Sequence, residues 1–192
     1  SLEKLEITSD VIGFKIAPLI NSVGRISEPK LIIDLLTSTS EVITQKLTKH
    51  CLEINRERKR LTAIAQEEAI DFVLANYDIN TKFLVLTKKD WHPGIIGIVA
   101  ARLVDRFNLP TAIISQGNDG IYRGSIRSNN LLNVTYALNE CNELLLSYGG
   151  HSAAAGFTIK EKNISKLKQK LNLIANRELI GLDLKKSIKP DA

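Results

Sequence analysis

The sequence is poor in several residue types that commonly support catalysis or cross-linking. Its 192 residues include no methionine, two cysteines, three histidines and one tryptophan. Cys51 and Cys141 lie far apart and belong to no CxxC motif, which argues against a disulfide framework and favours a reducing compartment. Because methionine is missing even at position 1, we expect the chain to be a fragment that lacks part of its active site.

Long apolar runs are also missing. No stretch of about 18 apolar residues exists, so the sequence predicts neither a membrane span nor a membrane partner. The N-terminus has no basic-then-apolar signal pattern, which makes the cytoplasm the expected location.

Motifs of independent catalysts are absent too. The histidines at positions 50, 92 and 151 are isolated, and no Asp and His cluster has the spacing of metal ligands. The sequence contains no Walker loop, no GxSxG motif and no Ser-His-Asp set. We therefore predict no metal ligand within the chain, and a ligand-binding surface without a catalytic centre of its own.

The charge balance gives a weak indication of a partner. The net charge is +5, and the nine Lys/Arg and four Asp/Glu from Lys160 to Ala192 account for all of it. A basic chain favours a polyanion as partner, although a solvated helix face explains the same pattern equally well.

The hydrophobic pattern predicts an α/β protein in which a long helix precedes a mixed β-sheet with flanking helices. Residues 1–37 mix apolar runs with turns and one short helix, Pro29 to Leu36. Residues 38–78 have helical spacing without glycine or proline, and Ser38 with Glu41 forms a capping-box signature. The next segment alternates in the order β-α-β-β-α-β-α, and it includes a helix that ends at Gly149. The tail after residue 178 is a linker or the start of another element.

Two stretches of the sheet region are candidate binding sites. In "YRGSIRS", Arg123, Ser125 and Arg127 share one face of a strand, which suits phosphate recognition or a merely exposed polar face. In "GGHSAAAG", Gly149, Gly150 and His151 precede small residues, which suits an anion or an ordinary helix end. We expect the two stretches to lie together at one edge of the sheet.

Two other stretches are weaker candidates. "DWHPGIIG" follows a strand and opens a helix, and we favour a structural role in which His92 caps and Trp91 plugs the core. In "INSVGR", Asn21 and Arg25 are placed to touch phosphate or simply to flank a turn. Trp91 and Tyr122 are the two aromatic residues near the proposed face, so base stacking is expected to be modest.

The motifs together resemble one family. "APLINSVGRISEP", the long charged helix, "WHPGIIGIVAARL", "GSIRS" and "YGGHSAAAGF" occur in the order found in RecJ, the bacterial single-strand-specific 5′→3′ DNA exonucleases among the DHH phosphoesterases. The resemblance extends from about Ile7 to Leu179 and implies three parts. Residues 1–37 would end the metal-binding DHH domain, 38–78 would form the connecting helix, and 79–178 would form the DHH-associated (DHHA1) domain. Residues 179–192 would lead to a following domain.

The resemblance also implies roles for six residues. Gly149, Gly150 and His151 match the Gly-Gly-His motif that faces the metal centre, where His151 would act at the scissile phosphate. Ser125 and Arg127 match a Ser-x-Arg pair that contacts the strand, and Arg25 matches a phosphate-binding arginine. Two departures weaken the match, since Leu19 replaces a family arginine and Ile126 a frequent glycine.

The function implied is therefore that of an enzyme fragment. The parent would hydrolyse single-stranded DNA with Mn²⁺ or Mg²⁺ in DNA repair and recombination, together with single-strand-binding protein and a helicase. Its metal ligands would lie before residue 1, so this chain alone would be inactive. Two alternatives remain: a short-oligonucleotide or cyclic-dinucleotide phosphodiesterase of the same superfamily, and a non-catalytic nucleic-acid-binding module.

Overall fold

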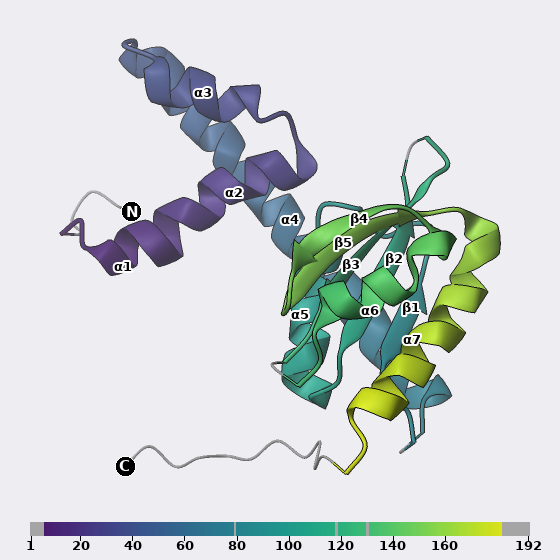
Figure 1. Ribbon diagram of the computed structural model, residues 1–192. Helices are drawn as coiled ribbons and strands as arrows, with labels where there is room; N and C mark the ends of the chain where they lie inside the picture. The colour runs from purple at the N-terminus through teal and green to yellow at the C-terminus, as the bar shows by residue number, and fades with distance from the viewer. Residues whose placement is uncertain (1–5, 79, 118, 130, 182–192) are drawn as a thin grey trace, which may run out of the picture. The chain divides into compact units, whose positions relative to one another are not determined.

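The computed structural model describes residues 6–78, 80–117, 119–129 and 131–181 (Figure 1). It divides into two compact units, Ser1–Leu61 and Thr62–Ala192, each of which is described by itself. Most of the tail that was predicted to be a linker or the start of another element, from residue 182 onward, lies outside the described residues.

The first unit is helical. Its elements are α1 (Ser9–Val11), the π-helix η2 (Ile12–Ile16), α2 (Ala17–Ile26), α3 (Lys30–Thr37) and the first part of α4 (Glu41–Asn76). A small core gathers Val23 with Cys51 and Ile54 of α4. The predicted short helix exists as α3. As expected, "INSVGR" stands just before a turn: it forms the last part of α2, and the bend at Ser27 and the turn at Pro29 follow.

The long helix α4 confirms the main helical prediction. Its 36 residues extend over about 54 Å at 1.5 Å per residue. The predicted capping box of Ser38 and Glu41 was wrong. A cap at Ser38 would start the helix at Thr39, whereas α4 begins two residues later, at Glu41. Ser40 caps it instead: its carbonyl accepts the Thr44 N–H (2.9 Å), and its Oγ accepts the Ile43 N–H (3.5 Å).

The second unit contains a five-stranded sheet in the order β1-β2-β3-β5-β4. Its strands are β1 (Leu84–Thr87), β2 (Thr111–Gln116), β3 (Tyr122–Arg127), β4 (Leu145–His151) and β5 (Ala154–Ile159). The pair β1 and β2 is parallel and the other pairs are antiparallel, so the sheet is mixed, as predicted.

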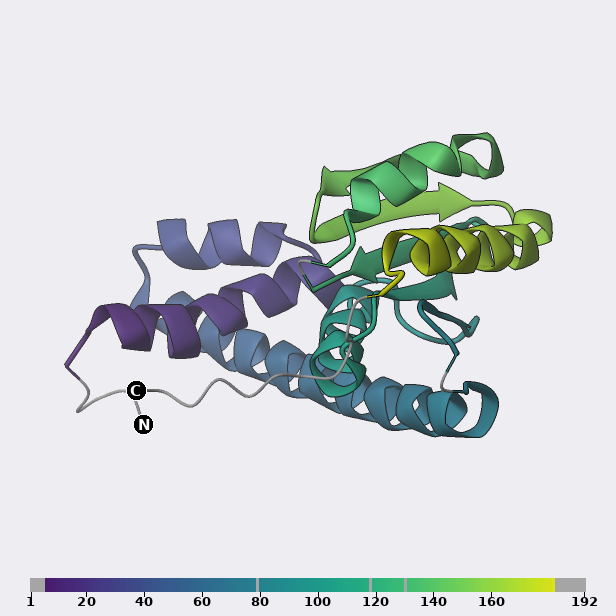
Figure 2. The same ribbon diagram turned by 60° about the horizontal axis from the view of Figure 1, so that its bottom comes forward.

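Helices lie on both faces of this sheet (Figure 2). One face, here called the core face, packs against α6 (Val134–Glu140) and α7 (Ile164–Glu178). The opposite face is covered over β2 and β3 by α5 (Ile96–Phe107). Pro93 precedes α5 in a turn, and Asn108 ends the helix in a left-handed conformation (φ 54°).

The sheet contains one strand that the sequence pattern did not predict. The helix expected to run to Tyr148 ends at Glu140, is followed by a 3₁₀ turn (η3, Asn142–Leu144), and then gives way to β4. The glycines at 149 and 150 therefore lie in a strand. The prediction of a helix that ends at Gly149 was therefore wrong. Strands β4 and β5 form a hairpin at the sheet edge.

Candidate functional site

Strand β3 separates a buried face from a polar one. Tyr122, Gly124 and Ile126 are buried, whereas Arg123, Ser125 and Arg127 are partly exposed. Because side chains alternate along a strand, the three polar residues point to the face opposite α6 and α7. We call the part of this face over β3, β5 and β4 the open face, although α5 covers part of it beside Ser125 and Arg127.

The hairpin places the Gly-Gly-His segment on the same open face. Arg127 lies opposite Ala154, which in turn lies opposite His151, while Ser125, Gly156 and Gly149 form the neighbouring row. Directly paired residues of antiparallel strands point to the same face. With a strand spacing of about 4.8 Å, the backbones of Arg127 and His151 are about 10 Å apart. The small side chains of β5 lie between them.

A β-bulge sets this arrangement. The pairing of β4 with β5 shifts between Leu145 and Ser147, so that Ser147 rather than Leu146 lies opposite Thr158. A shift of one residue exchanges the two faces of a strand. Without it, His151 and Gly149 would point to the core face. The bulge therefore brings His151 to the side that carries Arg127.

The two glycines before His151 serve different purposes. Gly150 has φ of 150°, and a Cβ added there would lie 2.4 Å from the Ala154 carbonyl oxygen, so the hairpin requires glycine. A Cβ added at Gly149 would meet no described atom within 4 Å, and one at Gly156 would meet only the Gly124 oxygen at 3.7 Å. Packing does not require these two glycines, whose exposed backbone forms a shallow floor.

One wall of this floor is built by β3 and the start of α5. Arg127 Nη1 donates to Ser125 Oγ (3.0 Å) and to the Ile126 carbonyl (2.7 Å). A Cβ added at Gly97 would lie 2.9 Å from both Arg127 Nη2 and Ser125 Oγ. Gly97 thus allows α5 to begin directly beside this pair. Sequence reasoning missed this role, for which the only signal was the second glycine of "PGIIG".

The remaining part of "DWHPGIIG" has contacts that fit the expected structural role. His92 Nδ1 accepts the Gly94 N–H at 3.0 Å. Trp91 is buried, and its Nε1 donates to Glu68 of α4 at 2.8 Å. Lys88 pairs with the same carboxylate at 2.7 Å, and the hydrogen bonds from Lys88 and Trp91 lower the pKa of Glu68. These contacts fix the loop to α4.

The prediction of two stacking aromatics beside the site was wrong. Trp91 is only 7% exposed and Tyr122 only 1%. Tyr122 points to the core face, where its hydroxyl donates to Glu161 (2.9 Å) and burial raises its pKa. The alternation that exposes Arg123 necessarily buries Tyr122, so Tyr122 offers no stacking surface to the open face.

Arg25 belongs to the first unit. It lies exposed in the last turn of α2, four residues after Asn21 and therefore on the same helix face. Both residues line an open pocket of about 530 Å³ whose other walls are mostly apolar, comprising Ile20, Gly24, Pro29, Ile32 and Ile33.

The described residues do not bring metal-binding side chains together. Nowhere among them do three or more His, Cys, Asp or Glu side chains gather in a way that could hold an ion. These residues do not fit a metal centre by themselves. The described helices also include none long and apolar enough to cross a membrane.

The fold defines an α/β domain with a mixed five-stranded sheet and flanking helices. The DHHA1 domain family matches residues 80–177, and the chain belongs to this family.

The RecJ exonucleases are similar over most of the chain. The single-stranded-DNA-specific exonuclease RecJ of Bacillus subtilis is 35% identical over 179 residues, 93% of this chain and 23% of the relative. RecJ of Thermus thermophilus is 31% identical over 166 residues, 86% of this chain and 24% of the relative. The chain thus spans about a quarter of the length of these relatives.

Solved RecJ structures share the fold. A Thermus thermophilus RecJ structure in complex with Mg²⁺ superimposes with a TM-score of 0.78 at 30% identity, covering 87% of this chain and 26% of that one. Exonuclease RecJ bound to manganese gives 0.78 at 29% identity, covering 92% and 44%. The α/β architecture with its preceding long helix is therefore that of a RecJ-type segment.

Proposed function

We propose that this chain is the strand-binding segment of a RecJ-type exonuclease and that its open face holds the sugar-phosphate backbone of single-stranded DNA. The observation that carries the proposal is the floor of Gly149 and Gly156, two glycines that packing does not require. Glycine in a strand normally weakens it and marks the close approach of another backbone. Arg127 and Ser125 on one side and His151 on the other supply donors around this floor.

The roles of the individual groups follow from their chemistry. Arg127 would bind phosphate oxygens through its planar fork, and Ser125 would both orient the guanidinium and donate to the strand. Gly149 and Gly150 would admit the backbone. His151, exposed at the end of β4, would reach the scissile phosphate. Arg25 would contact phosphate from the first unit.

The catalytic ions would come from outside this chain. Mg²⁺ and Mn²⁺ occur in the RecJ structures that share the fold, and ions of this kind activate water and stabilise a leaving oxygen in phosphodiester hydrolysis. The same proposal includes the domain limits given above and a role of the parent protein in repair and recombination. It also includes partners such as single-strand-binding protein or a helicase, and a cytoplasmic location. The similarity to RecJ favours it over the other phosphodiesterases and over a non-catalytic module.

Binding of a labelled single-stranded oligonucleotide to the chain tests the proposal. We expect fluorescence anisotropy to show affinity that falls linearly with the logarithm of salt concentration. Arg127→Ala should weaken binding about tenfold and reduce the salt slope by about 1. Arg177→Ala is the matched control, since it removes the same charge from α7, behind the core face, where Arg177 pairs with Glu140. No binding, or equal losses in the two variants, would contradict the proposal.

A further inference from the structure

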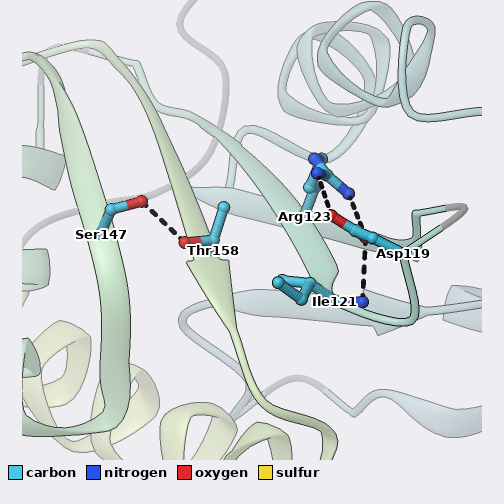
Figure 3. Close-up of polar contacts among 5 residues, drawn as sticks. All are labelled: Asp119, Ile121, Arg123, Ser147 and Thr158. Atoms are coloured by element: carbon cyan, nitrogen blue, oxygen red, sulfur yellow. Dashed lines mark hydrogen bonds and ion pairs between the residues drawn. The ribbon is translucent and has the colours of Figure 1, made fainter.

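A third row of polar side chains crosses the open face beyond the Arg127 and Ser125 rows. Arg123 on β3 lies opposite Thr158 on β5, which lies opposite Ser147 on β4. Figure 3 shows these three residues on their neighbouring strands. Side chains on one face of a strand recur about every 7 Å, so this row lies about 14 Å along the sheet from the Arg127 row.

Arg123 is held in a fixed position by the turn before β3. Its Nη1 and Nη2 donate to the two carboxylate oxygens of Asp119 at 2.9 and 2.7 Å (Figure 3). The guanidinium also lies against Gly117, where an added Cβ would clash with Nη1. Asp119 in turn accepts the Ile121 N–H at 3.1 Å, and the hydrogen bond from Arg123 holds the pKa of Asp119 well below its usual range. The carboxylate is therefore ionised at neutral pH and keeps the guanidinium ordered.

This ion pair is only half-buried and retains binding capacity. The side chains of Arg123 and Asp119 are 42% and 45% exposed. The two bonds to Asp119 occupy two of the five N–H groups of a guanidinium, so Arg123 can donate to a second anion without leaving its partner.

The hydroxyl pair beside Arg123 also has a donor to offer. Ser147 Oγ and Thr158 Oγ1 lie 2.7 Å apart, both on the open face. One proton joins the two oxygens, and the proton of the accepting hydroxyl remains to donate outward. The bulge in β4 creates this pair, because it places Ser147 instead of Leu146 opposite Thr158.

We propose that Arg123, Thr158 and Ser147 form a further subsite for the backbone of the strand, which extends the open face beyond Arg127, and that Asp119 holds Arg123 in place while weakening the subsite through its charge. This inference rests on the proposed function. The subsite would be reached only by a strand long enough to pass the floor of Gly149 and Gly156.

Oligonucleotide length and two matched pairs of variants test the subsite. Arg123→Ala should weaken the binding of an oligonucleotide of about 12 nucleotides roughly fivefold and leave a dinucleotide unaffected. Asp119→Asn should strengthen the longer ligand about twofold, because it removes a negative charge beside phosphate. Arg177→Ala and Glu140→Gln remove the same charges from an ion pair behind the core face, and we expect them to leave both affinities unchanged.

Two outcomes separate the two proposals. If the wild-type chain binds neither oligonucleotide, the proposed function fails and the subsite fails with it. If Arg127→Ala weakens binding while Arg123→Ala matches Arg177→Ala, the subsite alone is overturned. If Arg123→Ala lowers the thermal midpoint of unfolding, Arg123→Gln is measured in its place. Asp119→Asn still tests the subsite, because it should strengthen binding of the longer ligand, and unchanged affinity would contradict the subsite. Thr158→Val, which removes the hydroxyl at constant shape, should cost about twofold for the longer ligand only.

Discussion

The two faces of β3, β5 and β4 differ although the same strands build both. On the core face, Tyr122, Ile126 and Phe157 are at most 3% exposed and pack together with α6 and α7. On the open face, the alternate positions carry guanidinium, hydroxyl, imidazole and bare glycine. The core face therefore sets the stability of the hairpin, and the open face is available for binding.

Glycine shows this division most clearly. Gly124 points to the core face, and the ring of Phe157 fills the space of its missing side chain, since an added Cβ would lie 2.0 Å from that ring. Gly156, directly after the position that pairs with Ile126, has no such partner. The first glycine is explained by packing and the second is not, and the proposed strand-binding function would account for the second.

The largest expected effect comes from a substitution in the core face. Phe157→Ala should lower the free energy of unfolding by about 3–5 kcal/mol, because it removes a buried ring and leaves a cavity over Gly124. Urea denaturation followed by circular dichroism measures this loss. His151→Ala, on the exposed side of the hairpin, is the control and should stay within about 0.5 kcal/mol of wild type. Comparable losses in both variants would mean that His151 supports the fold rather than the site.

A second prediction separates the adjacent glycines of the hairpin. Gly150→Ala should destabilise the chain by about 1–3 kcal/mol, because its φ of 150° is strained for alanine and the added Cβ meets the Ala154 carbonyl. Gly149→Ala should keep or slightly raise stability, since alanine loses less conformational entropy than glycine on folding.

The decisive readout for this pair is binding. We expect Gly149→Ala to weaken single-stranded DNA binding in anisotropy titrations while its urea midpoint stays at or above that of wild type. A destabilised Gly149→Ala variant with unchanged affinity would show that Gly149 serves the hairpin, and the comparison between the two glycines would then fail.

The open face was predictable only in part. The alternation in "YRGSIRS" identified β3 and its polar side, because period two is visible within a single strand. The β4 strand was missed, since "ELLLSY" continues the apolar spacing of α6 and nothing local marks the change. Only pairing with β5 stabilises it as a strand, and such non-local pairing leaves no periodic signal.

Register and tertiary contact account for the other errors. The bulge that turns His151 to the open face results from the pairing of two strands, and the approach of Gly97 to Arg127 joins a helix to a strand about 30 positions later. The capping error at Ser38 was of another kind. Two serines stood at plausible cap positions, and the chain used Ser40, whose carbonyl already accepts the Thr44 N–H.

The smallest predicted effect concerns a thiol behind the core face. Cys141 ends α6 and is 0% exposed, and burial raises its pKa to about 11 from 9.0. As the pH rises, the thiol of the unfolded chain loses its proton before the thiol of the folded chain does. The stability that the buried, protonated thiol contributes is therefore complete below about pH 9 and is lost as the pH rises toward about 11. At about pH 10 the loss should be about 1 kcal/mol.

Urea midpoints at about pH 8 and about pH 10 should therefore differ more for wild type than for Cys141→Ala, in which this titration is absent. Other groups that titrate in this range cancel in the difference between the two proteins. Equal pH sensitivity would mean that water reaches the thiol, and that the packing behind the core face is looser than its burial indicates.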